Sequence, residues 1–232
     1  MNPFCNSYAL ASWACTVLDN KKINQVAPWR MLEYWMQVEL YRQAVTRKIG
    51  GWMQIGEFEQ SYYTALPRSG SKYNTKWVDL LFGESENGIP RWVEWIELKD
   101  IGRSARTMTS NLKGVGHDLA ALYTLRVSET KQLWLNPPAH IVDRGRQEEW
   151  NRLAPWLDAP EHLIAQIVII PHSFITENSD EIAKIWLQAF EARIKSVEDH
   201  GIKISSCNVH TNDLRTALSV YALVTSLPQI VN

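Results

Sequence analysis

The feature that most constrains the fold is a turn-rich segment between two apolar runs. Residues 75–82 and 92–98 are rich in the apolar and aromatic side chains typical of strands, and residues 83–90 read Gly-Glu-Ser-Glu-Asn-Gly-Ile-Pro. Glycine, asparagine and proline favour turns, and a short turn joins antiparallel neighbours. The sequence therefore predicts a β-hairpin, and with it a sheet that is at least partly antiparallel.

Helical spacing precedes and follows this hairpin. Between Trp29 and Lys48 apolar residues recur at every third or fourth position, Pro28 stands at the first turn and Gly50-Gly51 follow the end, so a long helix is predicted. Ser179 resembles the N-cap residue of a helix, and the residues that follow it predict a second amphipathic helix. These two and two other predicted helices cover residues 8–18, 29–48, 112–125 and 179–197.

Several shorter apolar segments predict additional strands. Residues 214–227 fit a strand by their Val, Tyr and Thr content or a helix by their Ala and Leu content, and residues 137–160 fit either a substrate-contacting inserted helix or an ordinary surface helix. The expected fold is α/β with α+β character, a central mixed β-sheet with an antiparallel meander flanked by helices. The additional strands are predicted over residues 52–55, 61–66, 132–136, 163–171 and 203–209.

Composition limits the class of protein. No repeat or Gly/Ser linker divides the 232 residues, so a single domain over residues 1–232 is expected. The three cysteines disfavour a disulfide scaffold and a structural zinc site, and the first 20 residues do not resemble a signal peptide or a membrane span, so a cytoplasmic protein without membrane association is expected. With 24 Lys and Arg against 25 Asp and Glu, the chain lacks a globally basic surface, and any nucleic acid must be bound by local patches.

Charged residues interrupt both strands of the predicted hairpin. Asp79 lies within an apolar run, where an unpaired buried carboxylate is costly. Glu97 and Lys99 share one face of the next strand because alternate side chains point the same way. If the strands pair, Asp79 and Glu97 approach each other at one end of the sheet. Two converging carboxylates need a positive charge between them, and Mg²⁺ prefers such oxygen ligands.

An aspartate, a hairpin and a Glu-x-Lys triplet together resemble the restriction-endonuclease-like, or PD-(D/E)xK, nuclease superfamily. The order of predicted elements also resembles that superfamily's shared core, which is a helix, a three-strand meander, a second helix and a further strand. The resemblance covers about residues 28–136, and residues 137–232 are then a C-terminal extension of strands and helices. The sequence departs from the family pattern at Val78, where the family name has proline.

The resemblance implies a Mg²⁺-dependent nuclease, a hydrolase of phosphodiester bonds, with DNA favoured over RNA and Mn²⁺ able to substitute for Mg²⁺. It implies a DNA endonuclease of restriction, repair or defence type, acting as a homodimer or in a larger complex. Asp79 and Glu97 would bind the metal, Lys99 would activate or orient the attacking water, and an acid on the first helix would complete the metal site. Glu39 is expected to be that acid, and Glu33, on a different face of the helix, is the alternative.

Basic residues cluster beside the predicted ligands. No acid lies between Glu59 and Asp79 or between Asp100 and Asp118, and both windows contain lysine and arginine. Such residues either hold the phosphates of a nucleic acid or belong to two solvated loops. The residues predicted to bind substrate are Lys76, Arg103, Arg106 and Lys113.

A different function class is also compatible with the sequence. The neutral net charge and the 11 tryptophans, some of which would sit at an interface, suit a non-catalytic nucleic-acid-binding or adaptor subunit built on the same scaffold. Because fold does not determine activity, metal binding is the property that separates the two hypotheses.

Overall fold

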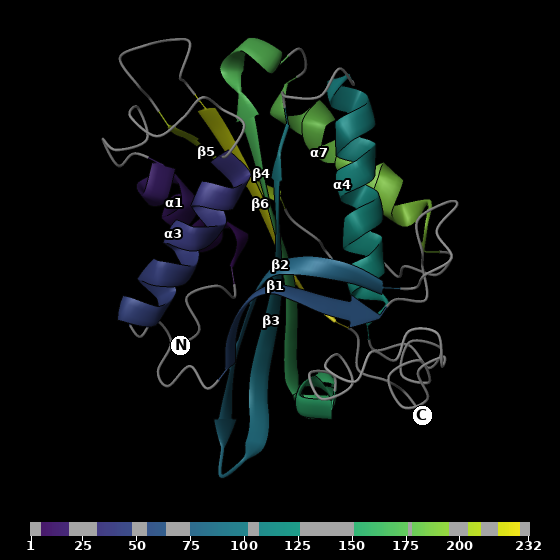
Figure 1. The fold of residues 1–232 in the computed structure, drawn as a ribbon. Helices are drawn as coiled ribbons and strands as arrows, with labels where there is room; N and C mark the ends of the chain where they lie inside the picture. The colour runs from purple at the N-terminus through teal and green to yellow at the C-terminus, as the bar shows by residue number, and fades with distance from the viewer. Residues whose placement is uncertain are drawn as a thin grey trace.

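The computed structural model describes residues 6–18, 32–47, 55–63, 75–101, 107–125, 151–175, 178–194, 204–209 and 218–227. Within these residues a six-stranded sheet has the order β1-β2-β3-β4-β6-β5 (Figure 1). Strands β3 and β4 pair in parallel, and all other neighbours are antiparallel. The predicted mixed sheet with an antiparallel meander is confirmed. The strands are β1 (Ile55–Tyr63), β2 (Thr75–Glu86), β3 (Ile89–Asp100), β4 (Glu161–Pro171), β5 (Ile204–Val209) and β6 (Leu218–Ser226).

Helices cover both faces of the sheet. Helices α1 (Ser7–Leu18) and α3 (Leu32–Arg47) lie on one face, and α4 (Met108–Tyr123) and α7 (Ser179–Glu191) lie on the other (Figure 1). Two buried apolar clusters result, because β3 sends Trp95 to the α4 side and Ile96 to the α3 side. A central strand buried on both faces is expected to be almost continuously apolar, as residues 163–170 of β4 are except for Gln166. Short 3-10 helices over Ala154–Asp158 and His172–Phe174 flank β4.

The hairpin is longer and tighter than predicted. Strand β2 continues to Glu86 and β3 starts at Ile89, so that the turn consists of Asn87 and Gly88 rather than residues 83–90. Both turn residues have positive φ, 53° for Asn87 and 79° for Gly88. Two such residues match the right-handed twist of the flanking strands, which is why the pairing extends to this turn.

Several predicted boundaries change in the structure. The strands predicted over residues 52–55 and 61–66 are replaced by one strand, Ile55–Tyr63, within the described residues. The helix predicted to reach residue 197 ends at Glu191, and its cap is Asn178, whose Oδ1 accepts a hydrogen bond from the N–H of Glu181 at 2.9 Å. Residues 218–226 form a strand, which resolves the open alternative. The strand predicted over residues 132–136 lies outside the described residues.

The parallel neighbour of β3 is β4, which begins at Glu161. The sheet therefore continues past residue 136, where the resemblance to the nuclease core was expected to end. None of the described helices is long and apolar enough to cross a membrane.

A buried polar network fixes α4 against the sheet and α7. Gln166 of β4 donates from Nε2 to the carbonyl oxygen of Val115 at 3.0 Å, and its Oε1 accepts from the indole N–H of Trp186 at 2.9 Å. The helices cross closely at Gly116, where an added Cβ would lie 2.5 Å from the carbonyl oxygen of Trp186. Because Gln166 is the parallel partner of Glu97, this network sets the position of α4 at the level of the predicted site.

Candidate active site

Strands β2 and β3 part where the predicted acids lie. Their ladder extends only to the pair Leu80 and Ile96, whereas the pairing of β1 with β2 continues as far as Thr75. Figure 1 shows β1 and β2 bending away from β3, which continues beside β4. The next positions on the two separating strands are Asp79 and Glu97. The sequence prediction that they occupy the same end of the sheet agrees with this register.

The Asp79 carboxylate is held from two directions. Its Oδ2 accepts a hydrogen bond from the backbone N–H of Leu98 at 2.5 Å, and its Oδ1 accepts one from the side-chain amide of Gln37 on α3. Burial raises the pKa of Asp79 to about 6, although nearby Lys99 and these hydrogen bonds act to lower it. Asp79 is thus a fixed carboxylate that exchanges a proton more readily near neutral pH than an exposed aspartate does.

Glu97 is buried, and only one of its two carboxylate oxygens has a partner among the described groups. Its Oε1 lies 2.5 Å from Nζ of Lys99, and its Oε2 is buried without a hydrogen-bond partner among the described groups. Burial, together with the carboxylates of Asp79 and Asp118, raises the pKa of Glu97 to about 8, although Lys99 acts to lower it. A buried carboxylate oxygen without a partner is costly unless a proton or a cation compensates it.

Lys99 supplies the positive charge of the cluster. Burial acts to lower the pKa of Lys99, but the surrounding carboxylates outweigh it and hold the pKa above the ordinary lysine value. Lys99 therefore stays protonated at neutral pH, and one ammonium serves several acids. These carboxylates belong to Glu97, Glu33, Asp79 and Asp118.

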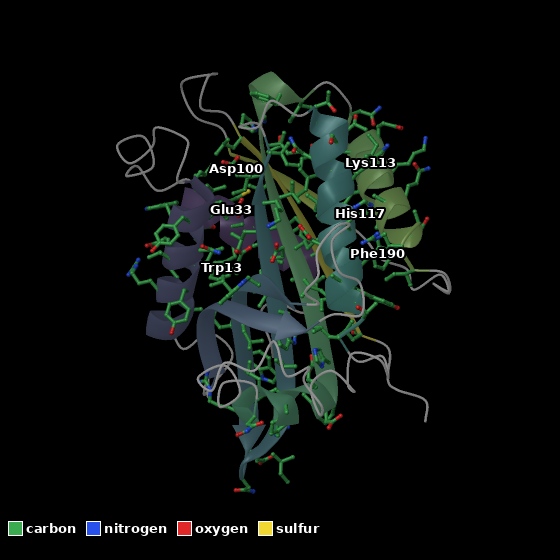
Figure 2. The ribbon with its side chains drawn as sticks, turned by 45° about the vertical axis from the view of Figure 1, so that its right-hand side comes forward. Trp13, Glu33, Asp100, Lys113, His117 and Phe190 are labelled. Atoms are coloured by element: carbon green, nitrogen blue, oxygen red, sulfur yellow. The ribbon has the colours of Figure 1, made fainter. Side chains whose placement is uncertain are left out.

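The two candidate acids of α3 have different partners. Glu33 accepts the backbone N–H of Asp100 at 3.1 Å through Oε2, and Figure 2 shows the two residues side by side at the end of β3. Glu39 instead accepts hydrogen bonds from Arg42 at 2.5 Å and Gln43 at 3.0 Å in its own helix. Glu33 shares a helix face with Gln37, which touches Asp79, whereas Glu39 lies about 200° around the helix from Gln37. The structure thus brings Glu33, the alternative acid, toward Asp79 and directs Glu39 elsewhere.

Two residues of the site were missed in the sequence. Gln37 carried no motif, and its role depends on the packing of α3 against the sheet. Asp118 of α4 is buried, and its carboxylate acts on both Glu97 and Lys99. A signal for Asp118 existed, because Asp118 falls beside the apolar stripe of α4 marked by Val115 and Leu119, where a charge is unusual.

The predicted substrate-binding residues are only partly described. Lys113 is exposed on α4, on the face of the sheet opposite to Glu33 (Figure 2). Lys76 lies in β2, but its side chain is outside the described residues, as are Arg103 and Arg106 entirely. Their role in binding phosphate stays a prediction.

The predicted Mg²⁺ can be compared with the oxygen ligands that the site offers. Among the described residues, no group of three or more His, Cys, Asp or Glu side chains is arranged to hold a metal ion. Lys99 takes one oxygen of Glu97, and two donors engage Asp79. Mg²⁺, however, commonly uses only one or two protein carboxylates, with water and substrate phosphate as its other ligands. Asp79 and the unsatisfied Oε2 of Glu97 suit that smaller donor set.

Comparisons of this chain with protein families, with curated proteins and with solved structures gave no match. The resemblance to the nuclease superfamily therefore rests on the residues of this chain and their arrangement alone.

Proposed function

We propose that this protein is a divalent-metal-dependent phosphodiesterase, and specifically a DNA endonuclease of restriction, repair or defence type. The observation that carries the proposal is the placement of Asp79 beside the Glu97 and Lys99 pair where β2 leaves β3. A rigid sheet end that presents two buried carboxylates and one ammonium has the charges needed to bind a metal and a phosphodiester.

The order of elements supports the same proposal. Helix α3, the β1–β3 meander, helix α4 and the parallel strand β4 follow the order that the restriction-endonuclease-like core has. This order alone does not imply an activity, because one fold can serve many functions. It adds weight because the acids and the lysine lie on the elements that the resemblance predicts.

Asp79 and Glu97 would hold the metal, with Glu33 close to them. A bound divalent cation lowers the pKa of a coordinated water and neutralises charge on the phosphate. Gln37 and the N–H of Leu98 keep the Asp79 carboxylate in one orientation. Lys99 would activate or orient the attacking water and stabilise negative charge close to it.

The proposal can be tested by cleavage of supercoiled plasmid DNA with Mg²⁺ or Mn²⁺. We expect Asp79→Asn, Glu97→Gln and Lys99→Met each to lower the cleavage rate by roughly 10²-fold or more, because each removes a charge from the site. The matched controls are Glu181→Gln and Lys184→Met, which alter an exposed Glu–Lys pair on α7. Variants of the site that cleave at the parent's rate contradict the proposal.

The charge of the chain bears on how it would hold its substrate and on its assembly. The net charge of −1 implies that DNA is held by local basic residues such as Lys113, by the metal and by a second subunit or partner. A homodimer would supply two sites for two strands, and a cytoplasmic location fits the composition. These points remain predictions from the sequence and the resemblance.

A non-catalytic nucleic-acid-binding or adaptor subunit is the second candidate. It is favoured by the ion pair between Lys99 and Glu97, which satisfies one of the predicted ligand atoms from within the protein. Calorimetric titration with Mn²⁺ separates the two candidates. A folded protein that binds no divalent cation favours the non-catalytic subunit, and cation binding that is lost in Glu97→Gln favours the nuclease.

A further inference from the structure

Gln37 is a buried amide whose contact lies inside the proposed metal site. Only 3% of its surface is exposed, and its Nε2 donates to Oδ1 of Asp79. The backbone N–H of Leu98 donates to Oδ2, at 2.5 Å. Donors from a helix and from a neighbouring strand therefore occupy both oxygens of one carboxylate.

This double engagement limits how the carboxylate can bind a cation. A carboxylate offers about four lone-pair positions, so one donor on each oxygen leaves one position on each. A cation that binds through a single oxygen uses one of these free positions. A cation that chelates both oxygens must share the carboxylate plane with Gln37 and Leu98, and the flexible amide of Gln37 is the donor that it would have to displace.

Divalent cations differ in this requirement. Ca²⁺ takes six to eight oxygen ligands at about 2.3–2.6 Å and often binds a carboxylate through both oxygens. Mg²⁺ is octahedral at about 2.0–2.1 Å, keeps several waters and needs only one or two carboxylates. Because Gln37 and Leu98 already engage both oxygens, the carboxylate of Asp79 disfavours a cation that must chelate both, and therefore disfavours Ca²⁺ more than Mg²⁺.

We propose that Gln37 is a positioning residue that sets the choice of cation, because it holds Oδ1 of Asp79 and so favours Mg²⁺ over Ca²⁺. The inference rests on the proposed function, since it concerns the same metal site. It adds a property that the acidic residues alone do not determine, the discrimination between two abundant divalent cations.

The test is calorimetric titration of the full chain with Mg²⁺ and, separately, with Ca²⁺. Gln37→Met keeps a similar side-chain volume and removes the donor. We expect the ratio of the Ca²⁺ affinity to the Mg²⁺ affinity to rise at least about fivefold, because Oδ1 becomes free to chelate. Gln37→Leu is the second variant; it also removes the donor and adds no charge or oxygen ligand, and we expect the same direction of change.

Gln43→Met is the matched control. Gln43 lies in the same helix, is also buried, and donates from Nε2 to Glu39 instead of Asp79. Its substitution is expected to leave the affinity ratio within about twofold of the parent, because it removes no donor from Asp79. Denaturation curves of each variant show whether it is folded under the titration conditions.

The outcomes separate this inference from the proposed function. An unchanged ratio in the folded Gln37 variants, or an equal change in Gln43→Met, overturns the role of Gln37 and leaves the nuclease proposal standing. A parent protein that binds neither cation overturns both.

Discussion

Single residues of the site are held in unusual charge states by their surroundings. Burial raises the pKa of Asp79 to about 6 and the pKa of Glu97 to about 8, while Lys99 remains protonated among the carboxylates. Structural ion pairs also perturb pKa values, but here the affected groups converge at the end of two separating strands. The negative charge of such a cluster must be compensated by a proton or a cation, which suits the proposed metal-dependent site.

The choice between the two acids of α3 is tested at this scale. We expect Glu33→Gln to weaken Mg²⁺ binding by about tenfold or more, since it removes a carboxylate close to Asp79 while its amide oxygen still accepts the N–H of Asp100. Glu39→Gln is expected to change the affinity less than about twofold, because Glu39 pairs with Arg42 and Gln43. Calorimetry measures both affinities, and a larger effect of Glu39→Gln would restore Glu39 as the helix acid.

At the scale of elements, the packing of α4 against α7 determines where Asp118 lies. The buried hydrogen bonds of Gln166 reach both helices, and Gly116 permits their close approach. A side chain at Gly116 would meet the backbone of α7 rather than a flexible side chain, so the helices would have to separate. The position of Asp118 in the site therefore depends on how α4 and α7 cross, on the opposite side of α4.

Two glycines of α4 provide a matched test of this crossing. Gly116→Ala is expected to lower the free energy of unfolding by about 1–3 kcal/mol, because its Cβ would lie 2.8 Å from Cβ of Ala189 and closer still to the backbone of Trp186. Gly114→Ala is expected to raise it by about 0.5–1 kcal/mol, since a Cβ there has no neighbour within 4 Å and alanine favours the helix. Urea denaturation measures both changes. Equal effects of the two substitutions would contradict the close crossing.

At the scale of the whole molecule, the buried acids of the site make the stability of the folded protein depend on pH. The folded-state pKa values of Asp79 and Glu97 lie above the value of about 4 expected in the unfolded chain. Between about pH 4 and these folded-state values, the folded protein therefore binds more protons than the unfolded chain does. The contribution of these two groups to stability is therefore greatest below about pH 4. It is lost progressively as the pH rises through about 6 and 8, where the buried carboxylates must ionise.

This coupling predicts how the stability difference between variant and parent changes with pH. Relative to the parent, Glu97→Gln is expected to become more stable as the pH rises from about 5 to 8 without divalent cations, because the amide does not ionise. Urea denaturation at several pH values in a chelator measures the difference. Parallel curves for Glu97→Gln and the parent would argue against a raised pKa at Glu97.

Local sequence patterns were sufficient for much of this protein. The period of apolar residues located α1, α3, α4 and β4, and the turn residues between two apolar runs predicted the hairpin of β2 and β3. The mixed α/β fold and the candidate set of Asp79, Glu97 and Lys99 followed from these patterns. They were accessible because side-chain periodicity and turn preference depend on neighbours in the chain.

Only the tertiary structure decided how these elements combine into a site. The rotation of α3 brings Glu33 and Gln37, not Glu39, toward Asp79, and the packing of α4 brings in Asp118. The same holds for β6, whose sequence fitted either a strand or a helix until its pairing with β4 and β5 was known. The physical reason is that helix rotation and strand pairing depend on burial against residues distant in sequence, which no local pattern contains.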